Sequence, residues 1–267
     1  MNILYIGDIM GEPGVRLVAD LLPKIKKEEK IDLVIAQAEN VTNGKGISKQ
    51  DFQQLRSIGI DFCTGGNWTL FDDDIHKILS DDNEPIIRPA NYPPGTDGKG
   101  YKYIDTKFGP VLVISLLGQI VGRDANKEVD NPLLVVDEIL REAKKRKPFT
   151  TIVNFHGDFS SEKRVIGYYL DGRVGAVVGD HWHVPTADAM VLPRGTAHIT
   201  DVGMCGTLDS SLGIKLDIVI HRWLDQRPSR NILETDGRKQ FNSVIISIND
   251  KTGLAENIFS RQIITEK

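Results

Sequence analysis

Carboxylate, amide and imidazole side chains follow several runs of apolar, β-branched residues along this 267-residue chain. Such runs predict strands, and polar side chains just beyond strand ends project from loops into a shared cleft. Carboxylate and amide oxygens with imidazoles, and no thiolate, are ligands that suit Fe, Mn, Zn or Mg. Because the groups are spread over the chain, we expect two neighbouring metal ions, an arrangement that cleaves phosphate esters. The candidate metal-ligating residues are Asp8, Glu39, Asn40, Asn67, His156, His181 and His183.

The Gly-Asp-His-Trp-His sequence at residues 179–183 is the strongest single indication of a metal site. An extended backbone sends residues i and i+2 to the same side, so His181 and His183 are expected to face one metal cluster. Two solvated loop histidines are the alternative interpretation. His156 taken alone is more often structural, and Asp8 taken alone is an ordinary residue of a strand-to-helix turn.

The other polar residues at strand ends also have ordinary explanations when they are taken one at a time. Glu39 and Asn40 can help to cap the following helix, and Asn67 can be a turn residue beside two glycines. Their coincidence at predicted strand ends favours the metal site. Three histidines are left over and are expected to be structural or solvated: His76, His198 and His221.

Strands that alternate with helices must position these side chains. Strands are expected at residues 3–6, 32–38, 60–64, 101–104, 111–115, 149–153 and 174–178. Helices are expected after Pro13 and near residues 48–57, 71–79, 131–147 and 160–170. This alternation predicts parallel βαβ units, and hairpins follow at residues 190–199 and after residue 243. We therefore expect an α/β fold, a single domain over residues 1–267 in which two packed sheets are flanked by helices as a four-layer sandwich.

The composition is that of an ordinary globular protein, with 40% hydrophobic and 26% charged residues. The net charge is −4, and the basic run at residues 144–147 is expected to end a helix, which argues against extended nucleic-acid binding. The two cysteines exclude a disulfide scaffold and favour reduced thiols in the cytoplasm. The N-terminal apolar run is interpreted as a strand rather than a signal peptide, and no membrane span is expected. The sequence is also compatible with a homo-oligomer.

Several of these motifs together resemble a known family. Gly7-Asp8, Gly66-Asn67, His156 and the segment at residues 179–183 resemble the spaced motifs of calcineurin-like metallophosphoesterases. Within that superfamily the chain resembles the YmdB-like bacterial phosphodiesterases. The segments that carry this closer resemblance occur in order along almost the whole chain, at residues 5–11, 38–40, 88–93, 161–163, 169–174 and 199–204.

The resemblance implies an α/β sandwich with a dinuclear metal centre that hydrolyses cyclic nucleotides, 2′,3′-cyclic or 3′,5′-cyclic monophosphates, with a bridging hydroxide as the nucleophile. It implies two divalent or trivalent ions per chain, Fe or Mn first and Mg or Zn as alternatives. It assigns catalytic roles to Glu39 and Asn67. By the same resemblance the ligands form two groups, Asp8, Glu39, Asn40 and His183 around one ion and Asn67, His156 and His181 around the other, with Glu39 bridging.

One departure from the family pattern bears directly on catalysis. The family usually has His directly after the Gly-Asn motif, where this chain has Trp68. An indole donates one hydrogen bond but cannot deliver a proton to a leaving oxygen. We therefore expect weak turnover that favours strained rings or good leaving groups. A catalytically weakened relative that binds metal and nucleotide as a sensor or scaffold is the alternative, and a phosphomonoesterase or nuclease is a third.

Overall fold

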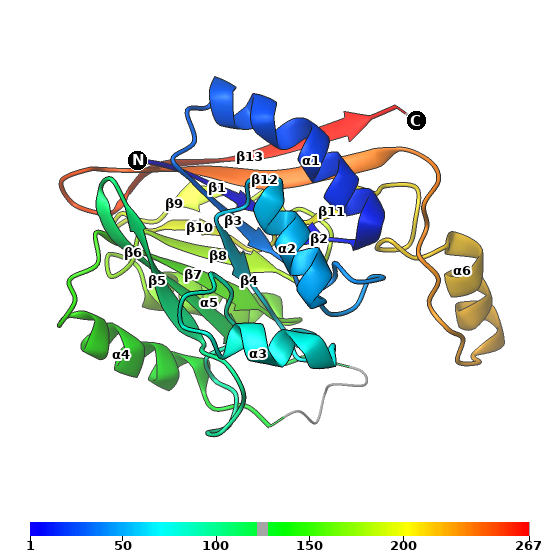
Figure 1. Cartoon of the computed structure of the whole chain (residues 1–267), viewed down its shortest axis with the longest axis horizontal. Helices are drawn as coiled ribbons and strands as arrows, with labels where there is room; N and C mark the ends of the chain where they lie inside the picture. The colour runs from blue at the N-terminus through cyan, green and yellow to red at the C-terminus, as the bar shows by residue number, and fades with distance from the viewer. Residues whose placement is uncertain (122–127, 267) are drawn as a thin grey trace.

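Two β-sheets form the inner layers of the structure, a computed structural model that describes residues 1–121 and 128–266 (Figure 1). The first sheet has the strand order β2-β11-β12-β1-β3-β4, with β13 paired to β12. Its strands are β1 (Asn2–Ile6), β2 (Asp8–Ile9), β3 (Leu33–Gln37), β4 (Phe62–Thr64), β11 (Met204–Thr207), β12 (Lys239–Ile248) and β13 (Ala255–Thr265).

The second sheet has the order β5-β6-β7-β8-β10-β9. Its strands are β5 (Tyr101–Thr106), β6 (Gly109–Leu117), β7 (Thr150–His156), β8 (Ala176–Asp180), β9 (Met190–Val191) and β10 (Ala197–Ile199). The strands β6, β7, β8 and β10 run parallel, as do β1, β3 and β4 in the first sheet. The expected βαβ units are confirmed in both sheets.

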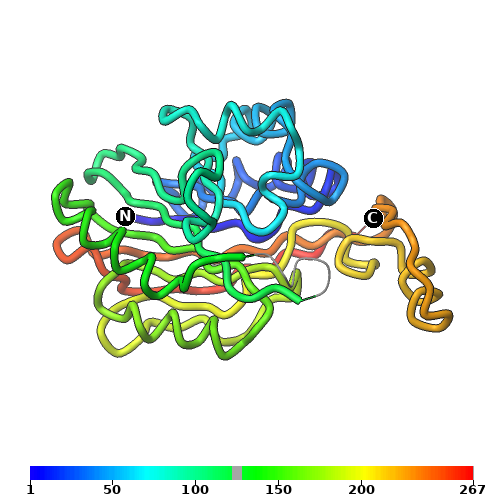
Figure 2. The backbone as a smooth tube through the Cα atoms, turned by 90° about the horizontal axis from the view of Figure 1, so that it is seen from below, coloured from blue at the N-terminus to red at the C-terminus, as the bar shows by residue number. Residues whose placement is uncertain are grey.

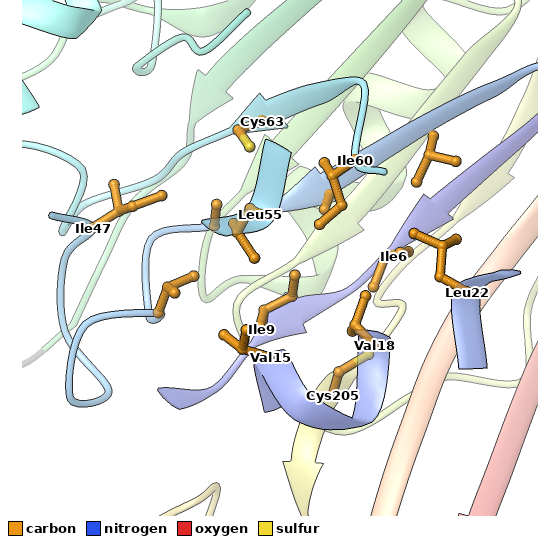
Figure 3. Packing of buried hydrophobic residues seen from close by; sticks show 14 of the residues in the cluster. Ile6, Ile9, Val15, Val18, Leu22, Ile47, Leu55, Ile60, Cys63 and Cys205 are labelled. Carbon is orange, nitrogen blue, oxygen red and sulfur yellow. The ribbon is translucent and has the colours of Figure 1, made fainter. Parts of the chain in front are cut away.

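Helices cover the outer face of each sheet, so the expected α/β sandwich with helices outside is confirmed (Figure 2). Helices α1 (Gly11–Glu28) and α2 (Lys49–Ser57) pack on the first sheet, and α4 (Pro132–Ala143) and α5 (Ser160–Tyr169) pack on the second. The apolar positions of α1 recur at helical spacing and place Val15, Val18 and Leu22 against the sheet (Figure 3). The Ser48 hydroxyl caps α2 by accepting from the Asp51 N–H.

A third apolar layer lies between the two sheets. It contains Tyr5 from β1, Ile35 from β3, Val113 from β6 and Val178 from β8, all fully buried. Parallel strands that are buried on both faces are continuous apolar runs, which is why their positions could be predicted from the sequence.

The structure differs from the expected elements in several places. The helix expected near residues 71–79 is a 3₁₀ turn, η1 (Asp73–Ile75), that continues into the short α3 (His76–Leu79). The strands β2 and β11, which pair with each other, were not expected. The segment that contains His221 forms α6 (Leu216–Asp225), which has no buried residue and projects from the body of the protein (Figure 1). Within the described residues, no helix is long and apolar enough to cross a membrane.

Candidate metal centre

The sheet register brings the candidate ligands to one edge of the sandwich. In the second sheet, Leu117, His156 and Asp180 pair across the carboxyl ends of β6, β7 and β8. In the first sheet, Glu39 follows β3, and Asn67 follows the neighbouring strand β4. Because parallel strands end at a common edge, residues far apart in the sequence meet there.

Asp8, Asn40 and His183 form one group of donors at this edge, and all three are buried. The Asn40 Nδ2 atom lies 3.2 Å from His183 Nε2 and 3.4 Å from Asp8 Oδ1. His183 Nδ1–H donates to the Leu212 carbonyl at 3.2 Å, which leaves Nε2 as the lone-pair nitrogen that faces the group. A flip of the Asn40 amide exchanges its nitrogen and oxygen, so either atom can face this point.

Glu39, Asn67, His156 and His181 form the second group. One ligand atom from each of Glu39, His156 and His181 lies within 4.8 Å of the other two. His156 Nε2 is 3.0 Å from Asn67 Oδ1 and 2.9 Å from Glu39 Oε1. The imidazole rings of His156 and His181 contact each other edge to face, with 4.4 Å between their centroids. Oxygen and nitrogen donors therefore converge on one small volume.

The two groups lie against each other. The His181 backbone N–H donates to Asp8 Oδ2 at 3.2 Å, which joins a residue of the second group to one of the first. The Trp68 N–H donates to Glu39 Oε2 at 2.8 Å and fixes that carboxylate. Gly66 lets the backbone pass close by, since a Cβ there would lie 2.4 Å from His156 Cδ2 and 2.5 Å from Glu39 Oε2. The structure thus brings all seven candidate residues together.

The backbone that carries the two loop histidines is not extended, so that expectation was wrong. His181 and His183 have φ angles of 103° and 62°, and the segment bends between them. Non-glycine residues with positive φ are uncommon and need support from their surroundings. The buried Asp201 supplies it by accepting the Trp182 N–H at 2.9 Å and pairing with Lys163 at 2.6 Å. The histidines reach the centre by this turn rather than by strand alternation.

Asp180 also belongs to the candidate site, although it was not among the residues expected from the motif at residues 179–183. It is fully buried and its Oδ1 accepts the His156 Nδ1–H at 2.7 Å. The other oxygen, Oδ2, accepts from the Tyr5 hydroxyl at 2.9 Å and from the Asn154 amide. A carboxylate on Nδ1 fixes the tautomer of a metal-ligating histidine and directs the Nε2 lone pair at the ion. The Gly-Asp-His sequence directly after a strand was the signal that could have revealed it.

The protonation behaviour of the centre reflects a concentration of buried negative charge. Burial and the neighbouring carboxylate of Asp180 hold the pKa of Asp8 well above its usual range. Burial alone would lower the pKa of His156, but Glu39 and Asp180 outweigh it and raise that pKa well above its ordinary value. Burial also opposes ionisation of Glu39, yet the charges of His156 and His181 lower its pKa.

These features fit a bound cation. Three buried carboxylates, Asp8, Glu39 and Asp180, lie together, and within residues 1–121 and 128–266 none forms a side-chain ion pair with a lysine or arginine. Glu39 Oε1 is buried and has no hydrogen-bond partner among the described residues, although His156 Nε2 is near. Burying such charge without compensation is costly, and metal coordination is one way to offset it.

The leftover histidines take ordinary roles. His76 pairs with Asp97 at 2.8 Å on the surface, and His221 is exposed on α6. His198 is buried and donates Nδ1–H to the Val177 carbonyl at 3.2 Å. They lie outside the two donor groups.

Solved structures share this architecture. A hypothetical protein from Thermus thermophilus matches with a TM-score of 0.90 and 36% identity over 100% of both chains. A phosphatase from Mycoplasma pneumoniae matches with a TM-score of 0.92 and 28% identity, over 100% of this chain and 94% of that one. A 5′-nucleotidase precursor, also from Thermus thermophilus, shares the fold alone, at 10% identity and a TM-score of 0.57 over 100% of this chain and 54% of that one. The fold defines the class of the protein, which is that of the metallophosphoesterase fold.

The sequence narrows this class. A family model described as YmdB-like protein matches residues 4–260. A relative in Bacillus subtilis (strain 168), named 2′,3′-cyclic-nucleotide 2′-phosphodiesterase, is 40% identical over 97% of this chain and 95% of its own length. The chain belongs to the YmdB-like protein family. A Mycoplasma genitalium relative, named putative phosphatase/phosphodiesterase, is 36% identical over 77% of this chain and 73% of its own. These names support a hydrolase of phosphate esters.

Proposed function

We propose that this protein is a metal-dependent phosphodiesterase that hydrolyses cyclic nucleotides, 2′,3′-cyclic or 3′,5′-cyclic monophosphates, at a centre of two metal ions. The observation that carries the proposal is the convergence of ligand atoms from Glu39, His156 and His181 within 4.8 Å of one another, beside the group formed by Asp8, Asn40 and His183. The Bacillus subtilis relative, named as a cyclic-nucleotide phosphodiesterase, supports the substrate class.

The seven residues would hold the ions in two groups, with Glu39 shared between them. Glu39 directly precedes Asn40 of the other group in the chain. Fe or Mn suits this mixture of imidazole and oxygen donors, and Mg or Zn is the alternative. Bound metals supply two things to phosphodiester cleavage, a water of lowered pKa and charge neutralisation on the phosphate oxygens. The chain itself orients His156 through Asp180 and fixes Glu39 through the Trp68 N–H.

A sensor or scaffold that binds metal and nucleotide without turnover is the second candidate, and Trp68 is the observation that favours it. The indole cannot act as a general acid, and losing such an acid typically costs on the order of 10²–10⁴ in rate. A strained 2′,3′-cyclic phosphate needs less proton assistance than an unstrained diester. We therefore place weak turnover of 2′,3′-cyclic substrates ahead of the sensor.

Metal analysis combined with an activity screen tests the proposal. Protein purified without chelator should carry close to two transition-metal ions per chain and hydrolyse a 2′,3′-cyclic nucleotide and a nitrophenyl diester. Glu39→Ala should lower the occupancy of both ions, and His181→Ala should abolish turnover. His76→Ala, a surface histidine outside the donor groups, is the matched control and should keep both metal and activity.

The outcomes separate the candidates. Two ions with turnover that chelation removes support the phosphodiesterase. Two ions and nucleotide binding with no turnover of either substrate favour the sensor. Absence of metal after reconstitution with Mn or Fe would contradict both.

We further propose that residues 1–267 act as one domain in the cytoplasm. The apolar layer between the sheets takes residues from both of them, which supports a single folding unit. The two cysteines, Cys63 and Cys205, are both buried and free, in keeping with a reducing compartment.

A further inference from the structure

A lysine lies in a corner formed by two aromatic rings, one of which belongs to Trp68, the residue directly after the candidate ligand Asn67. The Lys45 ammonium nitrogen is 3.7 Å from the centroid of the Trp68 ring and 3.9 Å from that of Phe71. The two rings are perpendicular, at an interplanar angle of 89° and a centroid distance of 6.1 Å. A cation over an aromatic face is attracted by the ring quadrupole, and two faces restrict the side chain more than one.

The backbone ties this lysine to the metal-binding residues. Lys45 lies in a tight turn whose neighbours Asn43, Gly44 and Gly46 all have positive φ angles. The Gly46 N–H donates to the Glu39 carbonyl, and Gly46 also pairs with Asn40 in an isolated bridge. Backbone contacts therefore hold the end of this turn against Glu39 and Asn40.

The aromatic side of the corner is tied to the same centre. Trp68 directly follows Asn67, and its backbone N–H donates to the Glu39 carboxylate at 2.8 Å. The Phe71 N–H closes the turn by donating to the Trp68 carbonyl at 3.0 Å. Lys45 is thus held between two segments, each of which also carries candidate ligands.

We propose that Lys45 binds a phosphate oxygen of the substrate and that Trp68 is the positioning residue that holds it there. This inference rests on the proposed function of the centre as a phosphodiesterase. A phosphodiester is an anion, and an ammonium with three N–H donors is a compact partner for its oxygens. At the position where the family usually has His, Trp68 cannot deliver a proton to a leaving group. Its ring instead holds the Lys45 cation.

The same contacts also fit a purely structural role, in which the lysine and the rings only stabilise the turn. The two roles differ in what they affect. A structural stack changes thermal stability or metal content, whereas a phosphate-binding cation changes the affinity for anions in protein that stays folded and metal-loaded. The test therefore measures anion affinity directly.

The experiment compares metal-loaded wild type with Lys45→Met, which keeps the length of the side chain but removes the charge, and with Lys45→Arg, which keeps the charge. Binding of inorganic phosphate is measured by calorimetry, and KM and kcat are measured on a 2′,3′-cyclic nucleotide. Lys49→Met, an exposed lysine at the start of α2, is the matched control for the loss of one positive charge.

For Lys45→Met we expect the Kd for phosphate and the KM to rise by about ten- to a hundredfold, the range that a charge-assisted hydrogen bond provides. Lys45→Arg and Lys49→Met should stay within a few-fold of wild type. Trp68→Leu should weaken phosphate binding in the same direction and Trp68→Phe less, because phenylalanine keeps an aromatic face. Thermal stability and metal content should match wild type in the Lys45 variants.

Unchanged phosphate affinity in folded, metal-loaded Lys45→Met would overturn the inference, and so would a wild-type protein that binds no phosphate. A loss of stability or metal without weaker phosphate binding would assign the stack a structural role and also overturn it. A wild type that never binds metal is a different result, because it contradicts the proposed function itself.

Discussion

Replacing Asp180 by Asn should weaken metal binding while leaving the fold intact. Asp180 is buried, and its carboxylate accepts from His156 at 2.7 Å, from Tyr5 at 2.9 Å and from the amides of Gln37 and Asn154. Asparagine has nearly the same shape but only one acceptor oxygen. At least one of these donors loses its partner, and the negative charge behind His156 disappears.

Two opposing effects set the stability of the metal-free variant. Hydrogen bonds to a charged group contribute about 1.5–3 kcal/mol each, so losing one destabilises the fold. Removing the charge also relieves repulsion of Asp8, whose pKa is raised by burial and by Asp180. We expect these effects to offset each other in large part in the metal-free protein.

For metal binding, no second effect offsets the loss of the Asp180 carboxylate. Loss of a carboxylate partner behind a ligating histidine typically lowers metal affinity about 10–100-fold. By mass action, the stability that saturating metal adds should fall by about 1.4–2.7 kcal/mol. The metal-bound protein should therefore lose thermal stability while the metal-free protein changes little.

Titration of chelator-stripped protein with Mn against a competing indicator measures the affinity, and thermal unfolding with and without metal measures the linkage. Asp171→Asn is the matched control, since Asp171 is a buried carboxylate that accepts the Arg194 and Thr196 N–H groups away from the centre. It should lower stability equally in both states. Wild-type metal affinity in Asp180→Asn would refute the role given to this residue.

Two further variants test the roles given to Trp68 and His198. Trp68→His should raise kcat on cyclic nucleotides by up to about 10², because an imidazole can deliver a proton, and should raise KM because Lys45 loses the indole face. Steady-state kinetics on a 2′,3′-cyclic nucleotide decide this, and an unchanged kcat would show that another group supplies the proton. Burial lowers the pKa of His198, reinforced by Arg164 and Lys163 and opposed by Asp188. Because the unfolded chain then binds the proton more readily, His198 costs stability as pH falls below about 6.5. Urea unfolding of metal-free protein between pH 7.5 and 5.5 measures the free energy of unfolding. It should fall less steeply toward low pH in His198→Gln than in wild type, and an identical pH dependence in both proteins would contradict this.

The buried parallel strands and the places where they end could be predicted from the sequence. Strands such as β3 and β8 consist mostly of apolar residues because both faces are covered, and a polar residue at the end of such a run marks the sheet edge. The strands β2 and β11 were missed because pieces of two and four residues carry no periodicity. Their pairing depends on Gly7 and Gly203 passing so close that a Cβ on Gly7 would lie 1.9 Å from the Gly203 carbonyl oxygen.

The part of the site that the sequence did not reveal consists of contacts between distant segments. The bond from His156 to Asp180 and the position of Lys45 over Trp68 join residues that no local pattern links. The backbone of the turn at residues 181–183 also depends on contacts with a distant segment. Alternation along an extended strand predicts that His181 and His183 face one side, but His181 has a positive φ, and the segment turns there while Asp201 accepts the Trp182 N–H.

The candidate centre takes its donors from both sheets, and this has a consequence for the proposed function. Asp8, Glu39 and Asn67 belong to or follow strands of the first sheet, whereas His156 ends a strand of the second sheet and His181 follows one. Metal bound between them would link two layers that otherwise meet through apolar side chains. Burial and the nearby carboxylate of Asp180 raise the pKa of Asp8 well above its usual range, so a cation at the centre would offset buried negative charge. The ions proposed for catalysis would therefore also favour the close packing of one sheet on the other, so activity and stability should depend on the same metal.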